Sequence, residues 1–236
     1  MSDETRDIAE ALLAAGTATV TWQLNRRGLW RCWLQGVAPL FPGWRCAGPA
    51  ATLRFSPARE DLATAESYQA PGSLREALEM TPAGAVVVAD GRGCRSMGLI
   101  GDMYATRLKV LGAAGFVTDT PVRDGEGLRA VGLPVFSAGL AAPASIHGLH
   151  YLDHGLPIGC GEATVVPGDL MVCDGDGAVV VPRALAGDVA EAALEQAAKE
   201  PFILELLQSG RGLVGTYPPD ESTVAEYQAW KARKKG

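Results

Sequence analysis

The hydrophobic pattern of this chain changes period several times, and each change marks an expected structural element. The most distinct is an unbroken apolar run at 85–90, which a polar, glycine-containing loop follows. An apolar run of this length with three consecutive valines is typical of a strand buried on both faces of a parallel sheet. The stretch 3–15 instead carries Ile8 and Leu12 at helical spacing and predicts a short helix.

Through the middle of the chain, extended and helical patterns alternate. Ser73 is placed to cap one helix, and Pro82 with Gly84 ends it. The alternation predicts β-α-β-α-β units with crossovers, and hence a largely parallel part of the sheet. The expected elements are strands at 50–55, 85–90, 115–119 and 133–137, and helices at 74–80, at 105–113 and from about 125.

After residue 140 the pattern predicts short strands joined by tight turns, then helix. Pro167-Gly168-Asp169 and Asp174-Gly175-Asp176-Gly177 have the composition of hairpin turns. With no internal repeat or low-complexity linker, we expect one domain over 1–236, with an N-terminal extension (about 1–45) and a C-terminal helical tail (about 210–236). The expected elements are irregular strand and loop at 17–48, strands at 156–158, 163–166, 170–173 and 178–181, a long helix at 184–208 and a polar helix from Glu221.

Composition narrows the class of protein. The 236 residues are 47% apolar and 20% charged, which is ordinary for a globular protein, and a net charge of −6 argues against nucleic acid as a partner. No apolar run approaches the roughly 18 residues of a membrane span, and the acidic first ten residues are unlike a secretory signal. Five scattered cysteines without C-x-x-C spacing indicate free thiols, so we expect a cytoplasmic protein.

The candidate chemistry lies in the segment from Gly101 to Asp124. The expected helix of about eleven residues advances roughly 16 Å, and the following strand of about five residues returns about the same distance. Asp102, at the helix start, is therefore expected near Arg123 and Asp124, where open α/β sheets bind ligands.

Two carboxylates and a guanidinium at a helix N-terminus suit an anionic substrate and a divalent cation. Mg²⁺ and Mn²⁺ prefer oxygen ligands and keep several waters. Gly101 lets the backbone approach a ligand closely, and Arg123 is suited to hold a substrate oxygen that gains negative charge. A plainer interpretation stays open on spacing alone: Asp102 as a helix cap, and Arg123-Asp124 as a surface turn.

Three other motifs do not have the full residue pattern of a metal or cofactor site. His147, His150 and His154 lack a common direction and a fourth ligand for zinc, although His147 alone is a candidate to line a pocket. The stretch Gly91-Arg92-Gly93-Cys94-Arg95-Ser96 lacks the third glycine of a dinucleotide fingerprint, which favours a pocket-lining loop. The 174–177 turn lacks the later ligands of a calcium loop and predicts a hairpin.

The spacing of Asp102 and Arg123-Asp124 resembles that of the RraA-like proteins, which include the 4-hydroxy-4-methyl-2-oxoglutarate aldolases. The resemblance implies an α/β fold, a layered α/β/β/α sandwich of the swivelling β/β/α type. It also implies homotrimers, or stacked hexamers, with the site between subunits. Further matching segments, in the expected order, are Gly48-Pro49-Ala50-Ala51-Thr52, Val131-Gly132-Leu133-Pro134-Val135-Phe136, Val166-Pro167-Gly168-Asp169-Leu170 and Asp176-Gly177-Ala178-Val179-Val180-Val181-Pro182.

The same resemblance implies a role for each site residue. Asp124 would bind Mg²⁺ or Mn²⁺, Asp102 would hold the metal's waters, and Arg123 would contact the keto oxygen of a pyruvyl group. Beside Gly101, the backbone N–H groups of Met103 and Tyr104 would receive the substrate carboxylate. Leucines commonly occupy those two positions in the family, so Tyr104 is expected to reshape the pocket.

Active aldolases of this family complete the metal's water shell with a glutamate from the C-terminal helix of a neighbouring subunit. Glu195 and Glu200 are the candidates here, and Glu200, in Lys199-Glu200, is the nearer match. Regulators of the family lack this acid.

The resemblance implies a metal-dependent carbon–carbon lyase. It would cleave a 4-hydroxy-2-oxo acid to pyruvate and a carbonyl product, with oxaloacetate decarboxylation as a side activity. The alternative is a non-catalytic regulator that binds a ribonuclease. The set of acids, Asp102, Asp124 and a helix glutamate, favours the enzyme.

Overall fold

The computed structural model describes residues 1–234, and eight of its strands form one mixed sheet. The order of the main path is β1-β5-β4-β3-β2-β9-β10, and β6 pairs with β2 beside it. β2, β3, β4 and β5 are parallel neighbours, and the other pairs are antiparallel. The strands are β1 (Ala38–Pro39), β2 (Cys46–Pro57), β3 (Val86–Asp90), β4 (Gly115–Thr118), β5 (Val135–Ser137), β6 (Leu149–His154), β9 (Leu170–Asp174) and β10 (Gly177–Val181).

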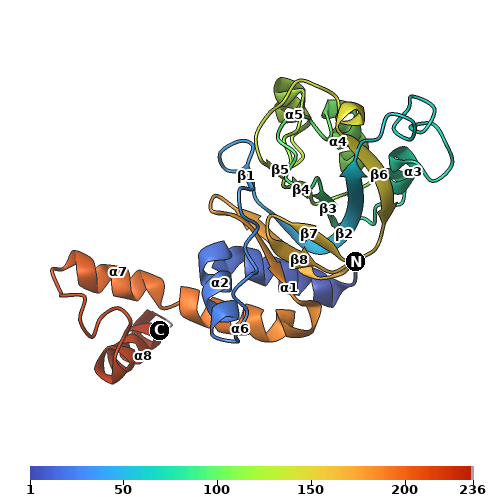
Figure 1. Cartoon of the computed structure of the whole chain (residues 1–236). Helices are drawn as coiled ribbons and strands as arrows, with labels where there is room; N and C mark the ends of the chain where they lie inside the picture. Colours follow the sequence, from blue (N-terminus) through green and yellow to red (C-terminus); the bar gives the residue numbers. More distant parts are fainter. Residues whose placement is uncertain (235–236) are drawn as a thin grey trace.

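Helices cover the sheet from two sides, and Figure 1 shows the two groups at opposite ends of the body. A separate hairpin of β7 (Ile158–Cys160) and β8 (Ala163–Val165) packs near β3. The helices of one side are α3 (Leu74–Glu79), α4 (Asp102–Val110) and α5 (Gly125–Val131), and those of the other are α1 (Asp3–Ala15), α2 (Thr17–Asn25) and α6 (Ala186–Ala197). The short 3₁₀ turns are η1 (Ser145–His147) and η2 (Arg183–Leu185).

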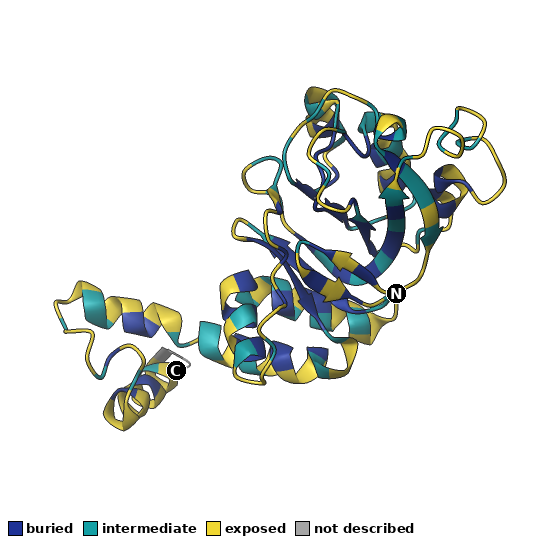
Figure 2. Ribbon diagram, viewed as in Figure 1, coloured by how far each residue is buried: buried dark blue, intermediate teal, exposed yellow. Residues whose placement is uncertain are grey.

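The alternation of side chains in β3 separates two hydrophobic clusters. Val86 and Val88 join the cluster that includes α1, α6, β9 and β10, whereas Val87 and Ala89 join the cluster under α3, α4 and α5. Figure 2 shows the buried strands between the two helical groups. The single sheet curls back between the two helical groups, so that its two parts form the middle layers of the fold, and this confirms the α/β class expected from the sequence.

Strand β2 belongs to both layers, because different parts of it pair with different strands. Residues 46–49 pair with β9, residues 50–54 with β3, and residues 53–57 with β6. The sequence predicted only its centre, 50–55. The strand β6 was missed altogether, and a strand was expected at 156–158 instead.

Helix α2 corrects the expectation of irregular structure at 17–48. Its N-terminus is capped from a distant part of the chain, because Asp174 accepts hydrogen bonds from the N–H and the hydroxyl of Thr17 at 2.8 and 2.6 Å. The helix is rich in threonine, which has low helix propensity, so tertiary contacts stabilise it.

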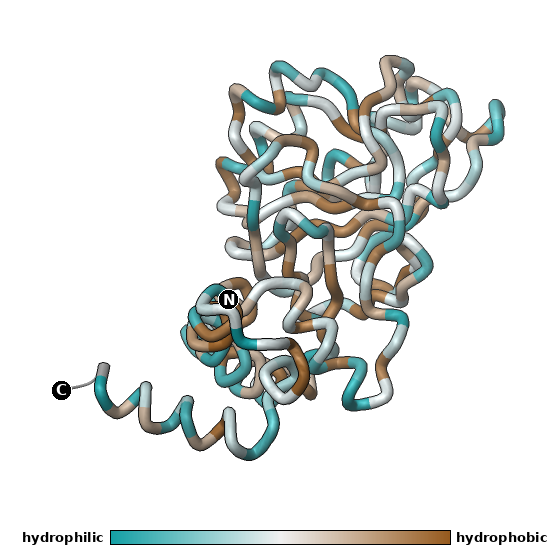
Figure 3. Tube along the Cα trace, turned by 90° about the vertical axis from the view of Figure 1, so that its left-hand side faces the viewer, coloured by the Kyte–Doolittle hydropathy of each residue, from teal (hydrophilic) through white to brown (hydrophobic). Residues whose placement is uncertain are grey.

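The expected helix at 184–208 is two helices, α6 and α7 (Glu200–Gln208), because Pro201 cannot continue a helix interior. α7 and α8 (Glu221–Lys234) form an arm that stands apart from the body in Figure 1, and Figure 3 shows the C-terminal helix extending beyond the rest of the chain. A small apolar cluster that includes Phe202 and Tyr227 holds the two helices together.

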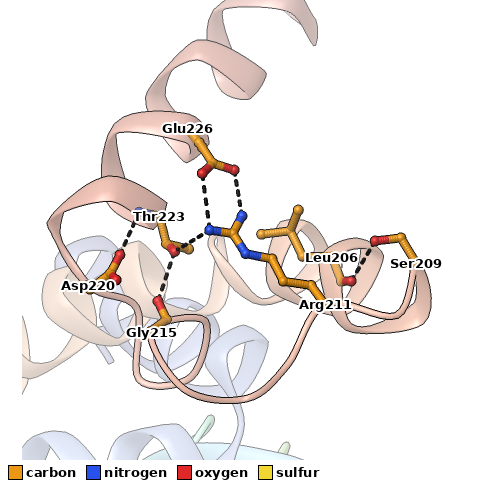
Figure 4. Close-up of polar contacts among 7 residues, drawn as sticks. All are labelled: Leu206, Ser209, Arg211, Gly215, Asp220, Thr223 and Glu226. Atoms are coloured by element: carbon orange, nitrogen blue, oxygen red, sulfur yellow. Dashed lines mark hydrogen bonds and ion pairs between the residues drawn. The ribbon is translucent and has the colours of Figure 1, made fainter.

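Polar contacts fix the turn between these two helices (Figure 4). Arg211 donates two hydrogen bonds to Glu226, at 2.6 and 3.1 Å, and the hydroxyl of Thr223 donates to the carbonyl of Gly215. Asp220 caps α8 by accepting from the N–H of Thr223 at 2.8 Å. Within residues 1–234, no helix is both long and apolar enough to cross a membrane.

Candidate functional site

The N-termini of α4 and α5 lie together at the carboxyl ends of β3 and β4. Gly101 precedes the first helix and Asp124 the second, and within the described chain neither N-terminus has a side-chain cap. The first N–H groups of a helix have no partner inside it, so these two N-termini together favour an anion.

Two glycines make room for the two carboxylates. A Cβ at Gly101 would lie 2.2 Å from Oδ2 of Asp124, and a Cβ at Gly127 would lie 2.5 Å from Oδ2 of Asp102. Each carboxylate therefore occupies the space that a side chain on the opposite helix would fill. The structure brings the two acids to one place, as the predicted helix and returning strand required.

Arg123 joins the two acids through its backbone and its side chain. Its N–H donates to the carbonyl of Ile100 at 2.9 Å, which ties the two loops together. Its Nε lies 3.2 Å from Oδ2 of Asp124, yet this buried atom has no well-directed hydrogen bond in the described chain. The ion pair therefore leaves the Nε–H of Arg123 without a well-aligned acceptor, which makes it a candidate donor to a ligand oxygen.

The backbone of Asp124 is left-handed, with φ 58° and ψ 47°. Only three non-glycine residues of the described chain have positive φ, and the other two are Arg92 and Glu162. Such a conformation costs of order 1–3 kcal/mol and is retained mostly where function requires it. Here it turns the carboxylate toward Gly101 and Arg123 instead of capping α5.

The two carboxylates fit a hydrated divalent cation. No group of three or more histidine, cysteine or acidic side chains among residues 1–234 is arranged to hold a metal ion. Mg²⁺ commonly binds through one or two carboxylates and keeps waters or substrate oxygens as its other ligands. The site therefore has the donors of a metal that shares its coordination with a substrate, and lacks those of a closed protein cage.

The residues after Asp102 form the rim of this site. Met103 is 78% exposed, and Tyr104 is partly buried. Close to Tyr104 lies Tyr68, whose hydroxyl contacts that of Ser145 at 2.9 Å. Burial raises the pKa of Tyr68, so the phenol stays neutral and able to donate. Sequence reasoning had not included Tyr68, which comes from the long loop after β2.

The two candidate glutamates lie elsewhere in the same chain. Glu195 is in α6 and pairs with Lys199 at 2.7 Å, and this partner lowers the pKa of the carboxyl. Glu200 begins α7 and accepts a long hydrogen bond, 3.4 Å, from Thr19. Both line a cavity of about 630 Å³ beside α2, at the end of the molecule opposite α4 and α5 in Figure 1.

The three histidines lie in η1 and β6. His147 ends η1, and His150 and His154 are in β6, where His154 Nδ1 contacts the hydroxyl of Tyr151 at 2.9 Å. Residues 174–177 form the β9–β10 hairpin, as predicted. The loop at 91–96 lines a cavity, as predicted. Gly127 was missed, although the two glycines that closely follow Asp124 were a visible signal of close packing.

Comparisons with known proteins identify the family. Residues 5–180 match the RraA-like family, described as Aldolase/RraA. The chain belongs to the RraA-like family. This membership confirms the family resemblance inferred from the sequence, and the structural similarity to other family members confirms the expected α/β RraA-like fold.

Three relatives illustrate the range of the family. A protein of Halalkalibacterium halodurans named "Putative 4-hydroxy-4-methyl-2-oxoglutarate aldolase" is 32% identical over 70% of this chain and 72% of its own. The Streptomyces coelicolor protein RraAS2, described as an unusual member of the RNase ES inhibitor RraA family, is 34% identical, with a TM-score of 0.75 over 83% of this chain and 94% of its own. An uncharacterized Pseudomonas syringae protein is 27% identical, with a TM-score of 0.77, and the match covers 90% of this chain and 97% of that protein's chain.

Proposed function

We propose that the protein is a divalent-metal-dependent lyase that cleaves a 4-hydroxy-2-oxo acid to pyruvate and a carbonyl product. The observation that carries the proposal is the convergence of Asp102, Arg123 and Asp124 on two uncapped helix N-termini, with Nε of Arg123 3.2 Å from Asp124 but without a well-directed hydrogen bond. The similarity to the protein named as an aldolase supports the same reaction class.

Each residue has a distinct role in this proposal. Asp124 would hold Mg²⁺ or Mn²⁺, and Asp102 would hold the waters around the ion. The N–H groups of Met103 and Tyr104, at the start of α4, would bind the substrate carboxylate beside Gly101. A divalent cation bound there supplies a Lewis acid that polarises the 2-oxo acid.

The reaction breaks the bond between C3 and C4. A water held by Asp102 would take the proton of the 4-hydroxyl, whose oxygen becomes the carbonyl of the product, and the bonding electron pair moves onto the pyruvyl group as an enolate. Arg123 donates to the enolate oxygen as its negative charge develops, and C3 then takes a proton to give pyruvate. Loss of CO₂ from oxaloacetate leaves the same enolate, so decarboxylation is the expected side activity.

A coupled pyruvate assay tests the proposal. We expect the protein to release pyruvate from one or more members of a panel of 4-hydroxy-2-oxo acids and from oxaloacetate when Mg²⁺ or Mn²⁺ is added. Chelation should remove the activity, and renewed metal should restore it. Absence of pyruvate release from the whole panel, at any concentration of either metal, would contradict the proposal.

A protein-binding regulator is the alternative function, and the likeness to RraAS2 favours it. A regulator needs a surface for its partner and gains nothing from a buried arginine donor beside two acids. If a ribonuclease is inhibited equally by the native protein and by a variant lacking Asp124, while no pyruvate is formed, the regulator is the correct assignment.

The choice between the two glutamates gives a further prediction. We propose that the protein is a homotrimer or hexamer in which Glu200 of one subunit reaches the metal waters of the next. Glu195 already pairs with Lys199, whereas the hydrogen bond seen for the Glu200 side chain within the described residues is a long one, from Thr19. We expect Glu200→Gln to lower pyruvate release by about 10- to 100-fold, as lost outer-sphere partners of a metal do. Glu195→Gln should stay within about threefold of the native activity.

Hybrid oligomers provide the control for this prediction. Asp124→Asn and Glu200→Gln subunits, each with little activity alone, should regain part of the native activity when produced together, because some sites then combine both native residues. Activity that does not rise in the hybrids, or that survives in isolated monomers, would exclude the shared site.

A further inference from the structure

A cavity that we call the arginine hollow opens beside the loop that follows β3. Its volume is about 780 Å³, within the range of small-molecule sites. The walls come from the ends of β3 and β4, from the loop after β3, from residues 35–36 and from the β7–β8 hairpin. The side chains that matter are Gln35, Asp90, Arg92, Arg95, Asp119 and Thr164. Asp102, Arg123 and Asp124 do not line it.

Asp119 holds the walls of the arginine hollow together. It is 8% exposed, and its carboxylate accepts N–H groups from Gly91, Gly93 and Gly161 at 2.9, 3.1 and 3.4 Å. These bonds join the loop after β3 to the turn of the β7–β8 hairpin. They use three of the about four acceptor positions of a carboxylate, so Asp119 shapes the hollow rather than binding a ligand.

Asp90 retains the acceptor capacity that Asp119 has lost. It is half-buried at the end of β3, and the only hydrogen bond recorded for its carboxylate in the described chain comes from the N–H of Arg92 at 2.9 Å. Burial raises the pKa of Asp90 and of Asp119, and the amide donors oppose this shift. Asp90 is therefore the acid placed to accept a hydroxyl group of a ligand.

Arg92 and Arg95 supply positive charge to the same space. Within residues 1–234, neither guanidinium forms a hydrogen bond or an ion pair shorter than 4 Å. The guanidinium of Arg95 lies against Gly36, where a Cβ would be 3.0 Å from its Nη2. Two arginines without partners in a concave site are suited to a carboxylate or a phosphate.

The backbone is strained where it presents charged side chains to the arginine hollow. Arg92 has φ 57°, and Glu162 has φ 64° in the two-residue turn between β7 and β8. Such turns favour asparagine or glycine, because both central residues need positive φ. Among residues 1–234, the third non-glycine residue with positive φ is Asp124, which belongs to the candidate active site. Backbone strain at two residues whose long charged side chains line one cavity points to a binding function.

We propose that the arginine hollow binds a small hydroxylated anion, with its acidic group between Arg92 and Arg95 and a hydroxyl group on Asp90. Gln35 and Thr164 offer further donors and acceptors at the rim. The acidic group is a carboxylate or a phosphate, as in a sugar acid or a sugar phosphate. This site does not depend on the function proposed above.

Calorimetric titration of the full-length protein with six-carbon probes tests the proposal. Gluconate carries the anion and the hydroxyl groups, sorbitol only the hydroxyl groups, and hexanoate only the anion; glucose 6-phosphate replaces the carboxylate by phosphate. We expect gluconate or glucose 6-phosphate to bind at least tenfold more tightly than sorbitol and hexanoate. If neither gluconate nor glucose 6-phosphate binds, or if all four probes bind alike, the proposal is wrong.

Matched variants locate the binding. Arg92→Asn removes the charge and tolerates the left-handed backbone, and with Arg95→Gln it should weaken the anion at least tenfold. Arg31→Gln, an exposed arginine outside the hollow, should leave binding unchanged. Asp124→Asn should also leave it unchanged, because that residue lies outside the hollow. Unaltered binding in Arg92→Asn/Arg95→Gln, or a changed oligomeric state of that variant, would overturn the assignment.

Discussion

Asp124→Asn is expected to lower metal-dependent pyruvate release by about a thousandfold, the upper end of what the loss of one preorganised electrostatic group costs. The substitution removes the negative charge that is proposed to hold the cation and keeps the size of the side chain. Asparagine also tolerates the left-handed backbone with φ 58°. The effect should therefore appear in activity and leave the fold intact.

Three measurements make this test decisive: pyruvate release, the affinity for Mn²⁺ and the melting temperature. We expect both function readouts to fall, while the melting temperature changes by less than about 3 °C, which corresponds to less than about 1 kcal/mol for a chain of this size. Asp176→Asn is the control, because Asp176 is an exposed residue of the β9–β10 turn. Native turnover in Asp124→Asn would refute the proposed metal ligand.

Gly101→Ala is expected to lower pyruvate release by about a hundredfold, the cost of a misplacement of roughly 1 Å at a catalytic group. The added Cβ would lie 2.2 Å from Oδ2 of Asp124, so the carboxylate must move. The backbone of Gly101 is extended, with φ −124° and ψ −167°, which alanine adopts without strain. Since a carboxylate rotates readily, we expect the position of the acid to change and the stability to remain close to native.

Gly187→Ala is the matched control for this glycine. Gly187 is exposed in α6, and nothing lies within 4 Å of the place that an added Cβ would take. Alanine there favours the helix by up to about 1 kcal/mol. This variant should keep full activity. If Gly101→Ala also keeps full activity at native metal affinity, the position of Asp124 Oδ2 does not matter to the reaction.

The central part of the fold was accessible from the sequence because its signals are local. The apolar run at 85–90 became β3, and the helix and strand between Gly101 and Asp119 brought Asp102 back to Arg123 and Asp124. Periodicity and element length are sufficient for such inferences, since crossover connections to parallel strands have few alternatives. The same reasoning gave the hairpin at 174–177.

The missed elements depend on distant residues. Helix α2 has weak intrinsic propensity and is capped by Asp174, which no local pattern reveals. Strand β6 is half-exposed and forms only because β2 offers it an edge, with Arg54 and Asp153 paired across it at 3.1 Å. The break before α7 was visible in the sequence, since Pro201 stands inside the expected helix.

The sequence predicted that Asp102, Arg123 and Asp124 lie together, but not how they pack. Asp102, Arg123 and Asp124 followed from composition and spacing. Each acid packs against a glycine of the other helix: Asp124 against Gly101, and Asp102 against Gly127. These contacts exist only in the folded chain. The left-handed backbone of Asp124 was equally hidden, because aspartate adopts that conformation only in particular contexts.

The pairing of β2 with both layers has a consequence for the newly made chain. Cys46 pairs with Cys173 on β9, and Phe55 pairs with Tyr151 on β6. The hydrogen bonds of β2 are therefore complete only after most of the polypeptide has been made. Contacts this distant in sequence make folding slow, and an unpaired strand edge invites association with other chains. During synthesis on the ribosome, β2 is therefore expected to pair first with β3 and to keep unpaired backbone at both of its ends until β6 and β9 have been made.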